Sequence, residues 1–307
     1  MESIKVFCPA TIANISCGFD VLGVALDAVG DEMVVRKTKQ KGIRITKLEG
    51  QDLPMETVQN VAGVAGLALL TASDYDGGFD IEIYKKIKAG SGIGSSAASS
   101  TGAVWAMNAL LGKPFSTLEL VKFAMEGERL ASGVAHADNV APALYGGFTL
   151  VRSYHPLDII EIPSPQDLYA TVIHPQIEVK TSDSRKILKT TLSLEDGIKQ
   201  WGNLGGLVAG LFKEDYALIG RSLEDHIVEP IRSILIPGFD AIKASAIENG
   251  ALGCGISGSG PSIFSFSKGE NTAKKVGLSM REVYDKIGID YDVHISKINV
   301  EGIKVIA

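Results

Sequence analysis

A glycine-serine loop, residues 90–96, holds the residue types that could most directly do chemistry. Three glycines alternate with small residues, and two serines follow the last glycine. An alternating apolar pattern over 79–84 predicts a strand before the loop, and the run over 97–111 predicts a helix after it. Glycine lets the backbone approach a ligand closely, and a helix start offers free N–H groups and a positive dipole end. The arrangement predicts a phosphate site, where Ser95 and Ser96 add hydroxyls, one of them to a magnesium ion.

Two familiar glycine motifs do not match this loop. A Walker A loop needs Gly-Lys-Ser/Thr after its spacer, and no lysine follows Gly94. A dinucleotide fingerprint needs G-x-G-x-x-G, whereas the loop reads G-x-G-x-G-S-S. For the glycines alone, the alternative is a tight loop whose small residues pack a helix on a sheet. The serines after Gly94 favour phosphate binding.

Three more segments combine small residues with polar side chains. They are residues 9–23 (PATIANISCGFDVLG), 135–142 (AHADNVAP) and 255–261 (GISGSGP). In this order around the serine-rich loop, the segments resemble the signature of the GHMP small-molecule kinases, and the form of each is similar to that of the homoserine kinases within that family. The resemblance runs from Ile4 to about Ile298. Four separated motifs in the right order are a specific signal.

The resemblance implies an α+β, two-domain GHMP-kinase fold with the active site in the cleft between the domains. The segment 156–165 contains three prolines, and we place the domain boundary there, giving domains 1–155 and 156–307. The patterns predict strands at 4–8, 33–37, 43–48, 79–84, 148–152, 169–174, 251–254, 262–267 and 291–295. They predict helices at 58–71, 95–111, 117–131, 139–145, 182–189, 194–212, 237–249 and 272–287.

The substrate that the resemblance implies, L-homoserine, carries an α-carboxylate, an α-ammonium and a terminal hydroxyl. A guanidinium pairs with a carboxylate through two bonds, which fixes orientation as well as charge. Arg185 and Arg232 match family positions with that role, although either alone would be read as a solvated surface arginine. The ammonium needs acceptors, and Asn14, Asp20 and Asp138 match positions that line this site. By itself, Asp20 could equally cap a turn.

Three further residues are assigned around the substrate by the same resemblance. His136 and Thr181 are expected to bind the substrate, His136 through a polar contact rather than by proton transfer. Asn139 is expected to act in catalysis, at a position where some relatives have an aspartate. Because an amide accepts no proton near neutral pH, we hypothesise that no side chain acts as a general base.

Magnesium prefers hard oxygen ligands and usually keeps several waters. Ser96 and Glu128 match the family's metal ligands and are expected to take part in catalysis, although Glu128 alone could be an exposed helix carboxylate. The residues that the resemblance assigns to ATP are Asn60, Val61, Ala89, Gly90, Ser91, Gly92, Ile93, Gly94, Ser95, Ser96, Ala97, Ser257 and Gly258.

Lysines stand just before the loop. Lys85, Lys86 and Lys88 could add positive field near phosphates, but a solvated lysine run is the commoner explanation. Lys88 occupies the place where the family motif usually begins with proline. The glycines and serines that follow are intact, so we expect function to be retained.

The overall composition and charge limit the classes of protein and of binding partner that fit this chain. The chain has 307 residues, 45% hydrophobic and 21% charged, which is typical of a soluble globular protein. Its net charge of −6 argues against a general nucleic-acid binder. Three widely spaced cysteines indicate reduced thiols in a cytosolic protein. The N-terminal pattern predicts a strand rather than a signal peptide, and no apolar run is long enough to predict a membrane span. The resemblance alone implies a homodimer.

The expected reaction is therefore transfer of the ATP γ-phosphoryl group to L-homoserine, giving O-phospho-L-homoserine and ADP on the route to threonine. Two alternatives stay open. One is another GHMP kinase that acts on a mevalonate-like or sugar substrate, against which Arg185 and Arg232 favour an amino acid. The other is a kinase-like sensor that binds nucleotide without turnover, against which the presence of Ser96 and Glu128 argues.

Overall fold

The computed structural model describes residues 2–306 apart from 178 and 180, and at 181 and 182 it describes the backbone alone. Its strands form two sheets, and seven described strands make up the first. Five run in the order β11-β1-β2-β4-β3, and the hairpin β5–β6 pairs with β2. These strands are β1 (Ser3–Ala13), β2 (Leu22–Thr38), β3 (Gly42–Glu49), β4 (Gly78–Tyr84), β5 (Phe148–Tyr154), β6 (Leu157–Ile162) and β11 (Lys304–Val305).

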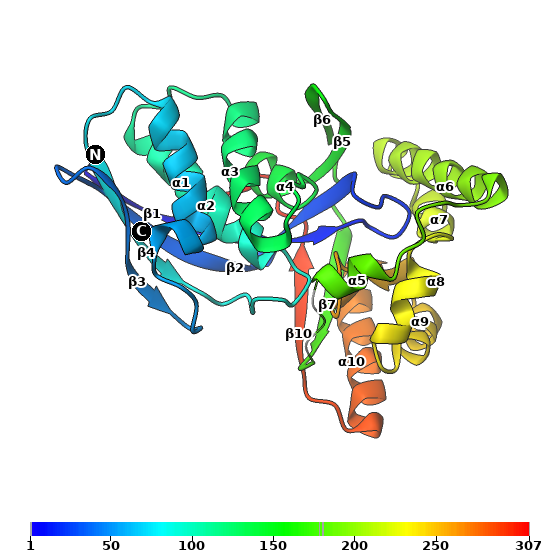
Figure 1. The fold of residues 1–307 in the computed structure, drawn as a ribbon. Helices are drawn as coiled ribbons and strands as arrows, with labels where there is room; N and C mark the ends of the chain where they lie inside the picture. The colour runs from blue at the N-terminus through cyan, green and yellow to red at the C-terminus, as the bar shows by residue number, and fades with distance from the viewer. Residues whose placement is uncertain (1, 178, 180, 307) are drawn as a thin grey trace.

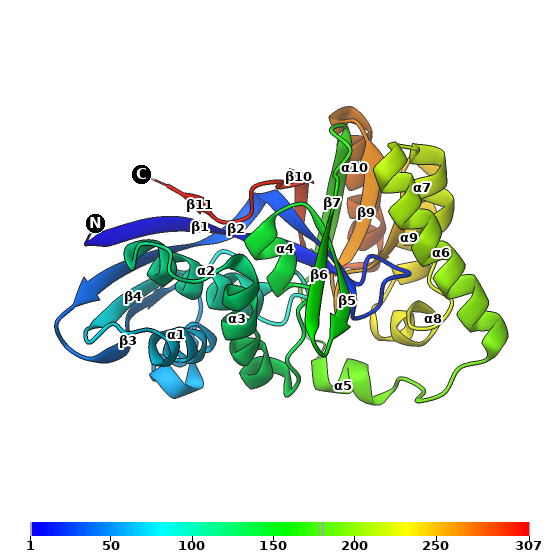
Figure 2. The same ribbon diagram turned by 90° about the horizontal axis from the view of Figure 1, so that it is seen from above.

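Helices cover one face of this first sheet (Figures 1 and 2). α2 packs directly on β1 and β2, while α1 and α3 pack beside it. The bounds of these helices are α1 (Val61–Ala72), α2 (Ser95–Leu110), α3 (Thr117–Ser132) and α4 (Val140–Tyr145), with a 3₁₀ turn at Thr57–Gln59.

The second sheet is antiparallel, with the order β10-β7-β9-β8. Helices α9 and α10 pack on it, and α6 and α7 pack against each other farther out (Figure 2). The strands are β7 (Leu168–Pro175), β8 (Gly253–Ile256), β9 (Ile263–Lys268) and β10 (Tyr291–Lys297). The helices are α5 (Thr181–Lys186), α6 (Leu194–Lys213), α7 (Tyr216–Ser222), α8 (Glu229–Arg232), α9 (Phe239–Glu248) and α10 (Glu270–Ile287), with a second 3₁₀ turn at Ser233–Leu235.

A shared apolar core joins the two sheets. The main cluster of buried side chains runs from β1 and α2 in the first sheet to β7 and β9 in the second. At the junction the rings of Phe148 on β5 and Phe266 on β9 lie 5.8 Å apart, edge to face. A smaller cluster fills the space between the second sheet and helices α9 and α10. Loops from the two halves are therefore held against each other by a common core.

Local sequence signals determine where helices α2 and α3 begin and where α3 ends. α2 begins directly after Gly94, which has a φ of +71°. α3 begins with a capping box, in which the Ser116 hydroxyl accepts from the Glu119 backbone N–H and the Glu119 carboxylate accepts from the Ser116 N–H. It ends at Gly133, whose φ of +79° suits only glycine without strain. Residue 128 is therefore held on a helix defined at both ends.

The α+β class and the two-part fold are confirmed. Helices α7 and α8 and strand β11 were not predicted, β1 is longer than the expected strand at 4–8, and two further differences concern β2 and the domain boundary. β2 spans 17 residues, far more than the expected strand at 33–37, because its first half pairs with both β1 and β5. The segment after Pro156 forms β6, which pairs with β5 in the first sheet. A boundary between 155 and 156 thus divides a hairpin, and the chain leaves the first sheet only after Ile162. The prolines mark the ends of a strand, which local composition cannot distinguish from a linker.

Candidate active site

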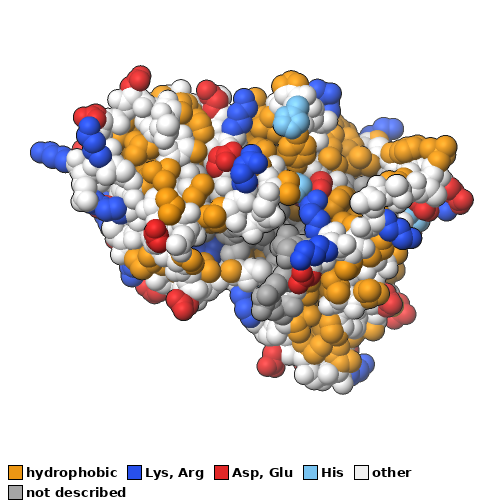
Figure 3. All heavy atoms as spheres, viewed as in Figure 1, with side chains coloured by type: hydrophobic (Ala, Val, Ile, Leu, Met, Phe, Trp, Pro, Cys, Tyr) orange, Lys and Arg blue, Asp and Glu red, His pale blue; other side chains and the backbone are white. Residues whose placement is uncertain are grey.

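A cavity of about 370 Å³ lies between the two halves of the molecule, where loops from both sheets meet. Figure 3 shows the recess, with Lys and Arg side chains along its rim. Most of the residues expected from the sequence line it. They are Asn14, Asp20, Val61, Ala89, Gly90, Gly92, Gly94, Ser95, Ser96, Glu128, His136, Asp138, Asn139, Arg185, Arg232 and Gly258.

The glycine loop needs its glycines. Gly90, Gly92 and Gly94 all have positive φ, between +71° and +83°. A Cβ on Gly94 would lie 2.0 Å from Thr11 Oγ1, and one on Gly92 would lie 2.7 Å from the Ser257 carbonyl oxygen. The loop therefore packs against β1 and against the loop 257–260 so tightly that no side chain fits at these two positions.

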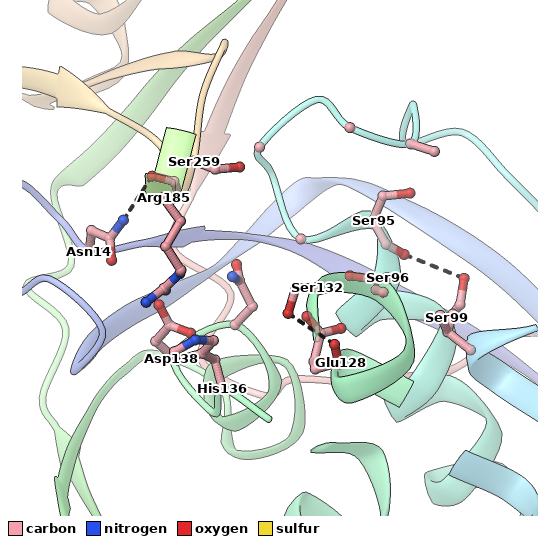
Figure 4. Close-up of a pocket in the computed structure, with 18 of the residues that line it drawn as sticks. Asn14, Ser95, Ser96, Ser99, Glu128, Ser132, His136, Asp138, Arg185 and Ser259 are labelled. Atoms are coloured by element: carbon pink, nitrogen blue, oxygen red, sulfur yellow. Dashed lines mark hydrogen bonds between the residues drawn. The ribbon is translucent and has the colours of Figure 1, made fainter. Parts of the chain in front are cut away.

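The two serines after the loop have different roles. The Ser95 hydroxyl donates to the Ile87 carbonyl at 2.9 Å and is buried. The half-buried Ser96 hydroxyl instead hydrogen-bonds to the carboxylate of Glu128 on α3. Figure 4 shows the side chains of Ser96 and Glu128 next to each other in the cavity. Ser95 thus holds the loop to the helix, and Ser96 is the serine available to a ligand.

The Glu128 carboxyl fits the role of a magnesium ligand. It is buried, and among the described residues its Oε1 has no hydrogen-bond partner. Burial raises the pKa of this carboxyl to about 7, against the opposing effects of the Ser96 hydroxyl and the Lys85 charge. The described residues contain no cluster of three or more His, Cys, Asp or Glu side chains able to hold a metal. Two hard oxygens suit an ion that completes its shell with phosphate and water.

Lys85 is not part of a solvated lysine run. Its side chain is 2% exposed and forms an ion pair with the equally buried Asp31. Its ammonium also donates to the Ser95 carbonyl at 2.9 Å and to the Ser99 hydroxyl at 3.1 Å. These contacts use the three donors of the ammonium. Lys85 therefore ties the first turn of α2 to β2. Lys86, in contrast, is exposed and pairs with Glu32.

The substrate end of the cavity holds two guanidinium groups. Arg232 is 3% exposed, and it donates to the carbonyls of Ser184 at 3.0 Å and Gly258 at 3.2 Å. Burial, followed by the nearby Arg185 charge, lowers its pKa to about 10, so it remains cationic at neutral pH. Arg185 donates two hydrogen bonds to the carboxylate of Asp20. A pair of cations at one end of the cavity suits an anionic group on a ligand.

Acceptors lie beside these cations. Burial, and then the charges of Asp20 and Glu128, raise the pKa of Asp138 to about 7. His136 Nδ1 lies 3.8 Å from Asp20 Oδ1, and burial lowers its pKa, so the ring is neutral at pH 7. Asn14 Nδ2 donates to the Gly258 carbonyl at 2.8 Å, which joins the first loop to the last motif. Carboxylate oxygens beside guanidinium groups can hold a ligand that carries both charges.

Asn139 lines the cavity. Its Oδ1 accepts from the Thr11 hydroxyl at 2.7 Å. The amide NH₂ group is the part that remains for a ligand. With its oxygen engaged in this way, Asn139 presents a hydrogen-bond donor to the cavity.

Five residues expected at the nucleotide lie behind the cavity wall: Asn60, Ser91, Ile93, Ala97 and Ser257. Asn60 is the N-cap of α1, since its Oδ1 accepts from the N–H groups of Ala62 and Gly63 and its Nδ2 donates to the Pro54 carbonyl. Both polar atoms of its side chain are thus engaged by the protein backbone.

The other buried residues of this set support the loop. The Ser257 hydroxyl donates to the Gly92 carbonyl at 2.8 Å, so the third motif closes on the loop. Ile93 belongs to the main apolar core. The side chain of Thr181 lies outside the described part of the chain.

Sequence reasoning left several residues of the site without a role, among them Phe19, Tyr154 and Ser259. Phe19 lies beneath both guanidinium groups, 5.5 Å from Arg185 Cζ and 5.1 Å from Arg232 Cζ. Tyr154 donates through its hydroxyl to the Asp20 carbonyl at 2.9 Å. Ser259 lines the cavity beside Gly258. Phe19 and Ser259 stand inside recognised motifs, which was the available signal; Tyr154 stands in none.

Comparison with known proteins identifies the family. Residues 57–147 match the model of the GHMP kinases N terminal domain, and residues 207–286 match that of the GHMP kinases C terminal domain. "Homoserine kinase" from Chlorobium phaeobacteroides is 46% identical over all of this chain and all of its own length, and that from Pyrococcus furiosus is 39% identical over 96% of this chain and 98% of its own.

A crystal structure of homoserine kinase from Cytophaga hutchinsonii is 54% identical, covers 100% of this chain and 98% of its own, and superposes with a TM-score of 0.96. A mevalonate kinase, 15% identical with a TM-score of 0.70, covers 97% of this chain and 99% of its own and shares the fold alone. The chain therefore belongs to the GHMP kinases, ATP-dependent enzymes, and within them to the group of the homoserine kinases.

Proposed function

We propose that this chain transfers the γ-phosphoryl group of ATP to the side-chain hydroxyl of L-homoserine, giving O-phospho-L-homoserine and ADP. The observation that carries the proposal is the division of one cavity into two ends. One end has the glycine loop, the start of α2 and the Ser96–Glu128 pair; the other has two guanidinium groups among carboxylates. The first end suits a metal-bound triphosphate, and the second suits an amino acid.

The phosphate end is built by the backbone. The loop 90–94 and the free N–H groups of the first turn of α2 would hold phosphate oxygens. Ser96 and Glu128 would hold Mg²⁺, which supplies charge neutralisation for the transferring phosphoryl group. Lys85 keeps this turn in place while its ammonium remains bonded to the protein. Val61 and Leu53 supply apolar contact for the base.

The amino-acid end would orient the acceptor. Arg185 and Arg232 would hold the carboxylate, and Asp138, Asp20 and Asn14 would accept from the ammonium. Holding both groups aligns the side-chain hydroxyl with the phosphate end, and alignment is the main requirement of phosphoryl transfer. His136 adds a polar contact, since its lowered pKa leaves it uncharged.

No side chain is assigned as a general base. Asn139 is a donor, and Asp138, His136 and Asp20 belong to the amino-acid end. In a loose transition state the nucleophile keeps its proton until late, so a phosphate oxygen can receive it. The amide of Asn139 would then orient the acceptor hydroxyl or a phosphate oxygen.

The deciding experiment measures ADP release from ATP with L-homoserine, mevalonate and galactose in parallel. We expect turnover with L-homoserine alone, because mevalonate lacks the ammonium and galactose lacks both charges. Phosphorus NMR of the product should show a phosphomonoester on the side-chain oxygen. Turnover with mevalonate or galactose would support the other GHMP activity, and nucleotide binding without turnover of any of the three would support a sensor.

The oligomeric state belongs to the same proposal. We propose a homodimer, for which the apolar residues exposed on α6 give a surface to cover. These are Leu194, Ile198, Trp201 and Phe212. Light scattering measures the mass in solution, and Trp201→Glu should yield monomers if this face is the interface. No helix in the described residues is long and apolar enough to cross a membrane.

A further inference from the structure

The Arg185 guanidinium is already paired with a carboxylate of its own chain. Its Nη1 and Nη2 donate to Asp20 Oδ2 and Oδ1 at 3.1 and 2.9 Å. This two-bond arrangement is the one in which a guanidinium also holds a free carboxylate. Asp20 therefore lies on Arg185 where a ligand's carboxylate would be bound.

The backbone of Asp20 is held independently of this ion pair. Its N–H donates to Asn14 Oδ1 at 2.9 Å, and its carbonyl accepts from the Tyr154 hydroxyl at 2.9 Å. Its φ of +59° fixes the direction in which the side chain leaves the loop. The carboxylate is a quarter exposed and can turn about its own side-chain bonds. Asp20 can thus change partner without moving the loop.

The two guanidinium groups also have a support that does not depend on Asp20. The ring of Phe19 lies 5.5 Å from Arg185 Cζ and 5.1 Å from Arg232 Cζ, within the range of cation–π attraction. Arg232 is further held by the carbonyls of Ser184 and Gly258. The cations therefore stay in place when the carboxylate of Asp20 leaves.

The charges at the amino-acid end of the cavity are balanced without a ligand. The walls there carry two acidic side chains, Asp20 and Asp138, and two basic ones, Arg185 and Arg232. The charge of Lys85 is already neutralised by Asp31. A ligand with one charge disturbs this balance, whereas a zwitterion preserves it. Burying a charge without a partner is costly, so balance favours the zwitterion.

We propose that Asp20 is a place-holder for the substrate carboxylate and makes the site selective for zwitterions. When the amino acid binds, its carboxylate replaces Asp20 on Arg185, and its ammonium becomes the new partner of Asp20. This inference rests on the proposed function, because it takes L-homoserine as the ligand. A ligand with only a carboxylate breaks the Asp20–Arg185 pair and leaves Asp20 unpartnered. A ligand with only an ammonium leaves Arg185 unpartnered.

The test is a titration calorimetry matrix without nucleotide. The ligands are L-homoserine, 4-hydroxybutanoate, which lacks the ammonium, and 3-aminopropan-1-ol, which lacks the carboxylate. The proteins are the wild type, Asp20→Asn, and Asp138→Asn as a matched control that removes a carboxylate from the same cavity but not from Arg185. In the wild type, each missing charge should weaken binding about ten- to hundred-fold.

Asp20→Asn should change the affinities for the two ligands in opposite directions. The variant should bind L-homoserine more weakly than the wild type does. It should bind 4-hydroxybutanoate more tightly, because no place-holder has to be displaced. Asp138→Asn should give a smaller gain for 4-hydroxybutanoate. An equal gain in affinity for 4-hydroxybutanoate in both variants would show that only the net charge of the cavity matters, and it would overturn the proposal. An unchanged ratio of the affinities for L-homoserine and 4-hydroxybutanoate in Asp20→Asn would overturn it too.

A crystal structure of the wild type with L-homoserine gives a measurement that needs no variant. The Asp20–Arg185 pair should be replaced by ligand contacts to both residues. A complex in which this pair persists would overturn the place-holder role while leaving the kinase proposal intact. Absence of L-homoserine phosphorylation in the wild type would instead overturn the proposed function, whatever the binding ratios.

Discussion

The hydroxyl of Thr11 on β1 donates to Oδ1 of Asn139, 128 residues away, at 2.7 Å. The bond fixes which half of the Asn139 amide faces the cavity. Thr11 Oγ1 also lies where a Cβ on Gly94 would be, so one threonine holds both the amide and the glycine loop. The amide NH₂ group is therefore the part of Asn139 that can reach a ligand.

The first prediction concerns this bond. Thr11→Val keeps the shape of the buried side chain but removes the donor, so the amide of Asn139 can turn. We expect kcat to fall about tenfold, the effect of one hydrogen bond, with both KM values little changed. Asn139→Ala should cost less than the roughly 10²–10⁴-fold that a general base contributes. Steady-state kinetics of both single variants and the double variant check this, and strictly additive losses would contradict the coupling.

The second prediction concerns the metal. Glu128→Gln keeps the shape of the side chain but removes the negative charge, so kcat should fall by orders of magnitude and the Mg²⁺ requirement should rise. The metal-free fold should be retained, because the variant no longer has to bury an anion at this position. Glu126→Gln, on the same helix and with a side chain that is 43% exposed, is the control. Unchanged turnover and Mg²⁺ dependence in Glu128→Gln would leave this carboxyl without a metal role.

The third prediction is a pH dependence of stability set by Asp138. Its pKa is raised from 3.8 when unfolded to about 7 when folded. The folded state therefore binds this proton more tightly, and the stabilisation present below pH 4 is lost as the pH rises toward 7. In the wild type the free energy of unfolding should fall by this effect on the order of a few kcal/mol, and in Asp138→Asn this fall should be absent. Urea unfolding of the ligand-free protein at pH 4.5 and 7.5 measures this; parallel slopes for wild type and variant would count against it.

The fourth prediction compares two glycines of one loop. Gly94→Ala places a Cβ 2.0 Å from Thr11 Oγ1, whereas Gly90→Ala meets no atom within 4 Å. Both positions have similar positive φ, so both variants carry the same backbone strain. Binding of a fluorescent ATP analogue should be lost in Gly94→Ala and only weakened in Gly90→Ala. An equal loss of affinity in the two variants would show that backbone strain, not contact with Thr11, causes the loss.

The fifth prediction concerns the buried guanidinium. Arg232→Ala should raise the KM for L-homoserine about ten- to hundred-fold with the KM for ATP nearly unchanged, since a charge-assisted bond contributes about 1.5–3 kcal/mol. Arg232→Lys should recover little, because an ammonium cannot form the two-bond fork. Arg129→Ala, an exposed arginine paired with Glu126, is the control. An unchanged KM for L-homoserine in Arg232→Ala removes this residue from the substrate site.

The sequence alone determined the local chemistry of this protein. Alternating glycines before paired serines specify a backbone with positive φ at the start of a helix, because that conformation depends on the residues themselves and their immediate neighbours. The order of the four motifs identified the family, and most of the expected site residues line one cavity. These features survive as sequence signals because each is written in a few consecutive residues.

The tertiary structure decided which side chains are free to act. Lys85 is buried in an ion pair with Asp31 on β2, and the side chain of Asn60 caps α1. Arg185 is paired with Asp20, 165 residues away. A side chain's burial and partners depend on residues that the fold brings together, and spacing along the chain carries no record of them. For the same reason β6 looked like a linker, since its place in the sheet comes from pairing with β5 rather than from its own composition.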